Sequence, residues 1–198
     1  MRRSFLVGIV PALAFAAIVA STKEAHAGPY LGVDLDLGTA FRGQTDFSYG
    51  IGGRFGYKFN IPRSYVYLQP EIGGHYMSFG SNAASLGADH ATTVNVGARF
   101  GLQGLVQPNV FAHVGYGILG NSLGGPEADI GAGVDFKIGP IFTLGLQIAY
   151  NTVTVTQTSQ GDLIAGPNGF PAAKWVNFGL VSGFNFGAAP ARRVYYYR

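Results

Sequence analysis

The segment WVNFGLVSGFNF, residues 175–186, sets the pattern by which the rest of the chain can be read. From Val176 onward every second residue is apolar except Ser182, and the residues between them are small and polar except Val181. A strand with one apolar face, one small polar face and an aromatic residue at its end fits the wall of a transmembrane β-barrel. We therefore expect this segment to close a barrel by pairing with a first strand of the same kind. The apolar positions are Val176, Phe178, Leu180, Phe184 and Phe186.

Seven earlier segments alternate with the same period of two, which is typical of strands. Together with the closing segment they predict an all-β fold, an eight-stranded antiparallel up-and-down transmembrane β-barrel. Pro70 interrupts the third segment, and because proline removes a ladder hydrogen bond we expect a bulge or local irregularity there. The seven segments span about residues 31–38, 47–59, 65–79, 94–103, 110–118, 129–138 and 142–151.

The charged residues inside these segments all fall on the polar side. A charge that faced lipid at mid-depth would cost roughly 2–4 kcal/mol, so a barrel explains their placement. A soluble β-sandwich would also alternate, but its outer face would carry Lys, Glu and Thr, whereas about half of the polar side here is glycine. The charged residues are Asp34, Asp36, Arg54, Lys58, Glu71, Arg99, Asp129, Asp135 and Lys137.

These charges are expected to meet inside the barrel. Eight strands enclose a lumen only wide enough for side chains to fill, and unpaired charges there would be costly. We expect a lumen ion-pair network made of all the residues just named except Asp129. Its expected centre is Glu71 with Arg54, Arg99 or both, and Lys137 is expected to pair with Asp135 or Asp34. The network is interpreted as a plug, with an ion gate as the alternative.

The two ends of the chain are expected to lie outside the barrel. Residues 1–27 combine a basic start, an apolar run from Phe5 to Ala20 and small residues before the cleavage point, which predicts a secretory signal peptide. The barrel is then expected over 28–186 and a short periplasmic tail over 187–198.

The composition excludes several classes of function. The chain has a net charge of +3, but the leader carries three bases and one acid, so the remainder is close to neutral. We therefore expect no nucleic-acid partner. Zero cysteines exclude a disulfide framework and thiolate metal sites, and no cofactor is expected.

The connections between the segments alternate in length. Short periplasmic turns and longer outer loops are typical of outer-membrane barrels, so both mature termini are expected in the periplasm. Segment 157–173 is the longest candidate for display to an extracellular partner. The short turns are expected at 60–64, 106–109 and 139–140, and the mostly longer loops at 42–46, 80–91, 120–127 and 157–173.

His75 and His113 both fall on the inward side of their segments. With the nearby carboxylates they could hold a metal ion, and His75 with Ser78 is the one sequence-close pair that a hydrolase could use. No compact ligand spacing supports a metal site, so we expect lumen histidines that fill hydrogen bonds, and no metal.

Aromatic residues near the segment ends are expected to form girdles at the two membrane interfaces. The alternative is that they fill the core, which the outward parity of most of them disfavours. The predicted girdle residues are Tyr57, Phe59, Tyr76, Tyr116, Phe142, Tyr150, Trp175 and Phe186.

The chain resembles the small OmpA/OmpX-type outer-membrane β-barrels. The resemblance rests on the alternating segments, the opening at Tyr30–Val33, the stretch Leu68–Gly73 and the aromatic close, and covers about 29–186. It implies a location in the bacterial outer membrane, with outer-membrane lipid and the barrel-assembly machinery as partners. Family members typically end on the aromatic residue of the last strand, whereas this chain continues beyond Phe186. A tail of this length cannot form the periplasmic peptidoglycan-binding domain that the larger relatives carry.

Three functions are compatible with these observations. The preferred one is a non-enzymatic structural or surface-interaction role, in adhesion or envelope integrity, for a barrel with a plugged polar lumen. The alternatives are an outer-leaflet enzyme that modifies lipid A, since such enzymes resemble this barrel, and a narrow channel for small solutes.

Overall fold

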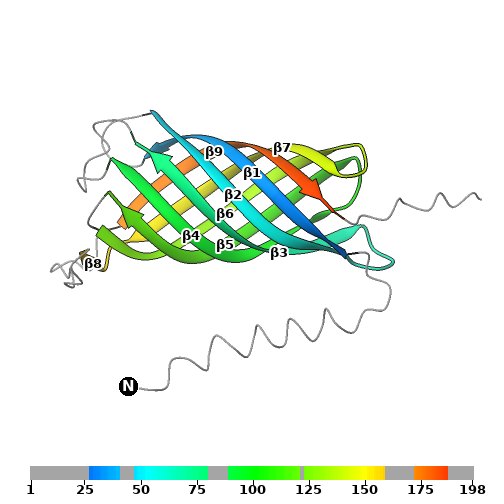
Figure 1. Cartoon of the computed structure of the whole chain (residues 1–198), viewed down its shortest axis with the longest axis horizontal. Helices are drawn as coiled ribbons and strands as arrows, with labels where there is room; N and C mark the ends of the chain where they lie inside the picture. The colour runs from blue at the N-terminus through cyan, green and yellow to red at the C-terminus, as the bar shows by residue number, and fades with distance from the viewer. Residues whose placement is uncertain (1–26, 41–46, 80–88, 121–122, 159–171, 187–198) are drawn as a thin grey trace, which may run out of the picture.

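Strands and short turns make up the parts of the chain that the computed structural model describes, residues 27–40, 47–79, 89–120, 123–158 and 172–186 (Figure 1). None of these residues forms a helix long and apolar enough to cross a membrane. The predicted leader, apart from Ala27, and the predicted tail lie outside the described residues.

Among the described residues, eight long strands and one short one form a single antiparallel sheet. The short strand β8 (Gln157–Thr158) pairs only with the start of β6. The long strands are β1 (Ala27–Ala40), β2 (Phe47–Asn60), β3 (Val66–Ser78), β4 (His90–Leu102), β5 (Val106–Leu119), β6 (Leu123–Ile138), β7 (Phe142–Thr154) and β9 (Ala172–Asn185).

The sheet closes on itself, because each long strand pairs with its neighbour in sequence and the last pairs with the first. In the closing ladder Leu35 of β1 lies opposite Leu180 of β9, and β9 also pairs with β7. Closure leaves no long strand with an unpaired edge, as hydrogen bonding inside a membrane demands. The predicted eight-stranded up-and-down barrel is confirmed.

The outer face of the barrel is apolar. Leu35, Ile51 and Phe178 lie on three different strands and expose 56%, 53% and 58% of their surface. Ser182 is the polar exception that the alternation showed in β9. Its hydroxyl donates to the carbonyl oxygen of Val33 at 3.4 Å, so the polar group is partnered even on this face.

The glycine-rich inner face makes room for inward aromatic rings. A side chain at Gly101 would come within 2.7 Å of the Tyr67 ring, and one at Gly131 would collide with the Phe111 ring. Tyr67 and Phe111 are both buried. These two glycines therefore leave space for bulky side chains of the same lumen, which explains why glycine is frequent on the inner face.

Several connections are shorter than predicted, since β4 begins at His90, β8 spans Gln157–Thr158 and β9 begins at Ala172, and two connections differ in kind. Residues 106–109, expected as a turn, begin β5, and the turn lies at 103–105 instead. Residues 123–127, expected in a long loop, form the start of β6. The alternation of apolar and polar residues could not be recognised there, because positions 124–126 are Gly124, Gly125 and Pro126. Pro126 lies opposite Tyr116 of β5, but pairing with β7 begins only at Glu127, so the missing N–H of the proline breaks no ladder with β7.

Pro70 causes a local irregularity but no bulge. Pairing between β2 and β3 has a gap at Gln69 and Pro70, and the register is the same on both sides of it. No residue is therefore inserted. On its other side Pro70 stays in register with Ala98 of β4.

The barrel has two distinct ends (Figure 1). The turn end carries the connections at 61–65, 103–105 and 139–141. Both ends of the described chain lie there, since Ala27 is opposite Phe59 and the N–H of Phe186 donates to the carbonyl oxygen of Pro29. The loop end carries the remaining connections, parts of which lie outside the described residues. Gly139 takes a φ of 76° in its turn, a conformation that favours glycine.

Candidate functional site

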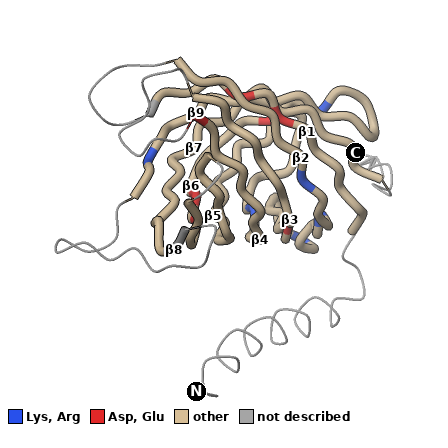
Figure 2. Tube along the Cα trace, turned by 60° about the vertical axis from the view of Figure 1, so that its left-hand side comes forward, with Lys and Arg blue, Asp and Glu red and all other residues tan. Residues whose placement is uncertain are grey.

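The lumen is filled by charged and amide side chains that come from most strands of the wall, and Figure 2 shows the charged positions spread over several of these strands. Each side chain reaches the lumen because it occupies an inward position of a strand with a period of two. These side chains are the candidate functional site, since the rest of the wall surface is apolar.

Glu71 of β3 lies at the centre of this network, and its side chain is only 1% exposed. Its Oε1 atom lies 3.4 Å from Nη2 of Arg99 and 3.8 Å from Nη1 of Arg54. Nε2 of His113 bonds the same oxygen at 2.8 Å, and Nε2 of Gln69 donates to Oε2 at 2.7 Å. A buried carboxylate is tolerated only with such partners. The structure thus brings the expected central residues together.

Both central arginines reach further acceptors. Nη2 of Arg54 donates to Asp34 at 2.8 Å and to Gln147 at 3.2 Å, which links β2 to β1 and β7. Nη1 of Arg99 donates to Oδ1 of Asn109 at 2.6 Å, and Nδ2 of Asn109 donates to Asp135 at 3.0 Å. The network therefore joins strands that are far apart in the wall.

His113 bridges two carboxylates. Besides the bond to Glu71, its Nδ1 atom lies 2.7 Å from Asp129, which also accepts from Nδ2 of Asn95 at 3.1 Å. An imidazole can donate to carboxylates on both sides only when both ring nitrogens carry hydrogen. His113 and Asp129 thereby extend the network beyond the residues predicted for it.

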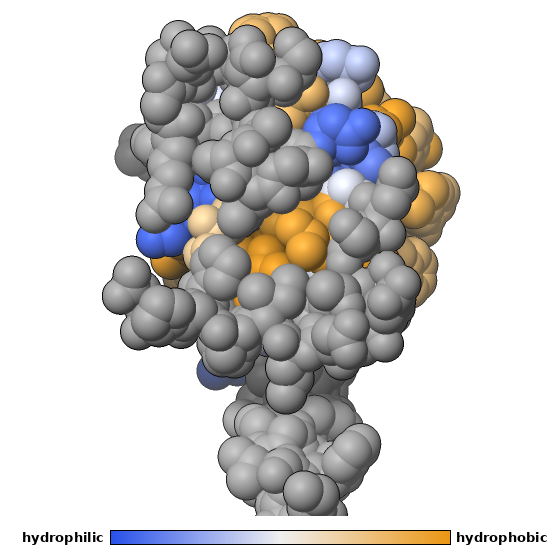
Figure 3. All heavy atoms as spheres, turned by 90° about the vertical axis from the view of Figure 1, so that its left-hand side faces the viewer, coloured by the Kyte–Doolittle hydropathy of each residue, from blue (hydrophilic) through white to orange (hydrophobic). Residues whose placement is uncertain are grey.

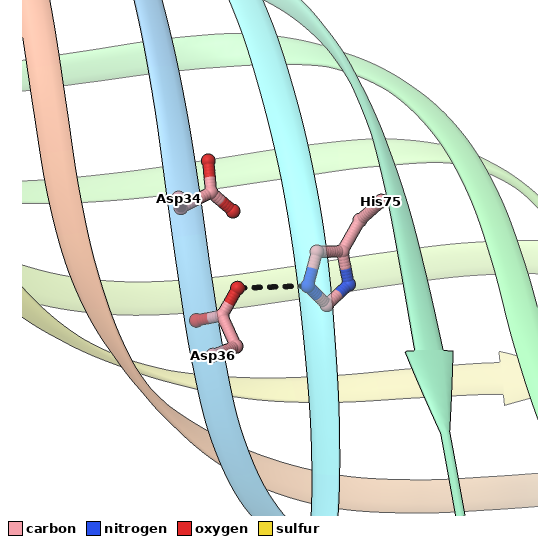
Figure 4. Close-up of side chains that lie close together, drawn as sticks. All are labelled: Asp34, Asp36 and His75. Carbon is pink, nitrogen blue, oxygen red and sulfur yellow. Dashed lines mark hydrogen bonds and ion pairs between the residues drawn. The ribbon is translucent and has the colours of Figure 1, made fainter.

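A second cluster lies on β1 and β3 (Figure 4). Nε2 of His75 bonds Oδ2 of Asp36 at 2.8 Å, and Oδ1 of Asp36 accepts from Nδ2 of Asn177 at 2.6 Å. Asp34, Asp36 and His75 offer ligand atoms within 4.8 Å of one another. Arg54, His75 and Asn177 donate to three of the four carboxylate oxygens of Asp34 and Asp36, so the negative charge of this pair is compensated within the protein. The expectation of a metal-free lumen stays a prediction.

The two lysines of the predicted network lie toward the turn end. Lys58 donates to Oε1 of Gln107 at 2.7 Å, and its Nζ atom lies 3.8 Å from the centre of the Tyr67 ring. Lys137 takes part in no ion pair within 4.0 Å among the described residues. The expected pairing of Lys137 with Asp135 or Asp34 is therefore wrong: Asp34 bonds Arg54, and Asp135 accepts from Asn109.

An apolar layer covers the loop end of the lumen. Figure 3 looks onto this end and shows apolar atoms at its centre. Phe79 packs edge-on against Trp175, with ring centroids 5.5 Å apart. The buried members of the layer are Met77, Ala91, Leu119, Val153, Val155 and Trp175.

Trp175 does not belong to a membrane-interface girdle, because it is 1% exposed and points into the barrel. Its odd number places it on the inward side of β9, together with Asn177 and Gly179. The other predicted girdle residues face outward, and their girdle role stays a prediction. Tyr57, Phe59, Phe142 and Phe186 lie toward the turn end, and Tyr76, Tyr116 and Tyr150 toward the loop end.

The described residues of the lumen enclose a polar cavity of about 50 Å³. Asp34, Glu71, His75, His113 and Asp129 line it together with several amides and glycines. This volume holds a few water molecules, each of which would find polar partners. Residues of the central network and of the second cluster both line the cavity.

His75 and Ser78 cannot act together. They are three residues apart on β3, and because successive side chains of a strand point to opposite faces, one faces the lumen and the other the outside. His75 bonds Asp36 inside the barrel instead.

Sequence reasoning missed several members of the network. Glu127 was assigned to a loop, although it lies on the inward face of β6 and is buried. Asn109 was likewise placed in a turn, although it lies within β5. Glu127 could have been predicted to face inward, because it lies two residues before Asp129 and so continues the alternation of β6 toward its glycine-rich start.

Comparison with known proteins gives a family match over most of the chain. A family model described as the outer membrane protein beta-barrel domain matches residues 8–186. No curated protein matches the chain.

Several solved structures resemble the chain in three dimensions. Neisserial surface protein A (NspA) is 15% identical, with 81% of this chain and 99% of that chain covered and a TM-score of 0.56. The outer membrane enzyme PagL is 17% identical, with 77% and 97% covered and a TM-score of 0.47. Ail, the attachment invasion locus protein of Yersinia pestis, is 12% identical, with 82% and 99% covered and a TM-score of 0.46. At these identities the likeness to NspA concerns the fold alone.

Proposed function

The chain belongs to the family of outer membrane protein β-barrel domains of the bacterial outer membrane, and on that premise we propose that it is a closed, non-enzymatic barrel with a structural or surface-interaction role. Its loop end faces the outside of the cell and engages an extracellular partner or supports envelope integrity. The barrel itself anchors this loop end in the outer membrane.

The paired charges that fill the lumen are the observation that supports this proposal. Arg54, Arg99 and His113 tie Glu71 of β3 to β2, β4 and β5, and Arg54 also donates to Gln147 of β7. An ion that entered would have to displace these buried pairs, which costs several kcal/mol. The apolar layer above them adds a second barrier, because apolar constrictions exclude hydrated ions. A closed lumen favours an anchor over a channel.

The geometry of the two ends supports the proposed orientation. In outer-membrane barrels short turns face the periplasm and longer loops the exterior. The turn end carries Ala27 and Phe186, so both mature termini face the periplasm in this orientation. Outer-membrane lipid then surrounds the apolar wall, and the barrel-assembly machinery inserts it.

The placement of His75 favours a non-enzymatic role. An outer-leaflet enzyme needs its nucleophile and base on the face that meets lipid, whereas His75 bonds Asp36 inside the lumen and Ser78 lies on the opposite face of β3. We therefore propose no lipid A-modifying activity, and expect unchanged lipid A in a strain that lacks the protein.

Planar-bilayer recording of the purified protein tests the closed lumen. We expect no steady open-channel current from the wild type. The double variant Arg54→Ala/Arg99→Ala serves as the control, because removing two guanidinium groups opens the centre of the lumen and should give small currents. Steady large currents from the wild type would overturn the plug.

A deletion strain tests the surface role. We expect loss of adhesion to host or abiotic surfaces, or greater sensitivity to detergents, and recovery with the wild-type protein on a plasmid. A variant with residues 159–171 replaced by a short Gly-Ser linker separates the two roles, since it should restore detergent resistance but not adhesion. If deletion changes neither property, the proposed role is wrong.

A further inference from the structure

Glu127 is a buried carboxylate that has no donor within hydrogen-bond distance and no cationic group within 4.0 Å among the described residues, and its polar neighbours are Asn95 and Asp129. It lies on β6, faces inward between Gly115 of β5 and Val153 of β7, and is 3% exposed. Both of its carboxylate oxygens are buried without a hydrogen bond to any described residue. Burying an ionised carboxylate in this way is costly, and such groups in native structures commonly point to a missing ion or proton.

A second carboxylate lies next to Glu127. Asp129 follows two residues later on the same face of β6, so the two side chains are neighbours on that face. Asp129 is bonded to His113 and Asn95. Neither ring nitrogen of His113 is free, because the other bonds Glu71. The pair therefore offers oxygen ligands only, and each oxygen of Asp129 already accepts one hydrogen bond.

A matched acid pair on β1 shows what Glu127 lacks. Asp34 and Asp36 have the same spacing of two and also lie beside a histidine. Arg54, His75 and Asn177 donate to their oxygens, so that pair has its compensation within the protein. Glu127 has no arginine, lysine or histidine within ion-pair distance among the described residues.

The excess of carboxylates in the lumen and the nearby polar cavity also favour a cation at Glu127. The described inward-facing residues include six carboxylates against four arginines and lysines. The polar cavity of about 50 Å³ is lined by Asp129, Asn95 and Thr93, so it reaches the Asp129 side of the pair, whereas Glu127 does not line it. A bound cation could keep a few waters there.

In contrast to the expectation of a metal-free lumen, we propose that Glu127 and Asp129 form a binding site for one hard divalent cation, of the Ca²⁺ type, in the loop half of the lumen. Carboxylate oxygens and water are the ligands that such cations prefer. The cation neutralises the one carboxylate that the network leaves without a partner, and it ties β6 to the central network through Asp129 and His113.

Binding of Ca²⁺ alone tests the site. The protein is purified from outer membranes in a zwitterionic detergent, stripped with EDTA and dialysed against radiolabelled Ca²⁺. We expect saturable binding of about one ion per chain and a higher unfolding temperature with Ca²⁺ than with EDTA. Glu127→Gln keeps the shape of the side chain and should weaken Ca²⁺ binding by at least about tenfold, because a ligand charge is lost.

Asp36→Asn is the matched control, since it changes the same chemical group in the acid pair that already has partners. It should leave Ca²⁺ binding unchanged. Heat-modifiable migration on a gel verifies that each variant is folded, and Asp129→Asn replaces Glu127→Gln if the latter does not fold. The proposal fails if the wild type shows no saturable binding, if Glu127→Gln binds as well as the wild type, or if Asp36→Asn weakens binding equally.

Discussion

At the scale of single residues, Glu71 determines how the lumen charges are arranged. One of its oxygens faces Arg54, Arg99 and His113 together. Three cationic or potentially cationic groups around one carboxylate repel one another when that carboxylate is absent. The contribution of Glu71 to stability is therefore mainly the avoidance of uncompensated buried charge.

Replacing Glu71 tests this reasoning. Glu71→Gln keeps the size of the side chain but removes its charge, and should lower the free energy of unfolding by about 3–5 kcal/mol. Urea unfolding in detergent micelles, followed by the gel shift of the folded barrel, measures the loss.

Asp89→Asn provides the matched control for this charge removal. Asp89 pairs with His90 at 2.6 Å, but its side chain is 78% exposed. Exposed pairs contribute less than about 1 kcal/mol, so this variant should unfold close to the wild type. Equal losses in the two variants would contradict the assignment of Glu71 as the centre of the network.

At the scale of the strand, alternation decides which environment each side chain meets. In β9 the even positions Phe178 and Leu180 face outward, whereas Trp175, Asn177 and Gly179 face the lumen. Residue type alone suggested an interfacial girdle for Trp175. The position of a residue in the alternation, and not its type, decides which face its side chain lies on. The backbone of a strand cannot turn one side chain to the other face without a bulge.

The fluorescence of Trp175, the single tryptophan of the chain, can report its environment directly. In vesicles that contain brominated lipids, we expect little quenching, because the bromine atoms stay outside the barrel wall. The double variant Trp175→Phe/Phe178→Trp moves the indole to the outward side of β9 and should be strongly quenched. Strong quenching of the wild type would place Trp175 in the lipid and contradict the inward assignment.

At the scale of the whole molecule, closure between β1 and β9 makes the lumen possible. These strands come from opposite ends of the chain, and their ladder runs from Tyr30 opposite Asn185 to Ala40 opposite Trp175. Without it both strands would expose unpaired backbone groups to lipid, which costs several kcal/mol for each group.

An engineered disulfide across this seam tests both closure and register. The chain has no cysteine, so Leu35→Cys/Leu180→Cys introduces a single pair at directly opposed positions. Opposed residues of antiparallel strands have the Cα separation that a disulfide needs. We expect efficient oxidation of the folded protein by a membrane-permeant catalyst, seen as faster migration on a non-reducing gel.

The pair Leu35→Cys/Val176→Cys is the control for this experiment, because Val176 lies opposite Thr39 and far from Leu35 along the ladder. It should remain reduced under the same conditions. Equal oxidation of both pairs, or of neither, would mean that β1 and β9 are not joined in this register.

The outward and inward faces could be predicted from the sequence, and the pairing partners only in part. Glu71 with Arg54 and Arg99 was predictable because few charges lie at mid-depth and buried ions need partners. The partner of Lys137 was predicted wrongly. Partners across a lumen depend on the tilt and stagger of the strands, which no local pattern encodes.

By itself, the sequence determined that this chain forms a barrel wall with an apolar outer face and a polar inner face. The face on which a side chain lies depends only on its own strand, because the period of two and the high cost of charge in lipid act on every strand separately. Only the tertiary structure decided that His113 of β5 bridges Glu71 and Asp129, that Trp175 joins the apolar layer, and that Glu127 is left without a partner. These contacts join residues on different strands, and their distances are set by how the closed sheet is staggered around its axis.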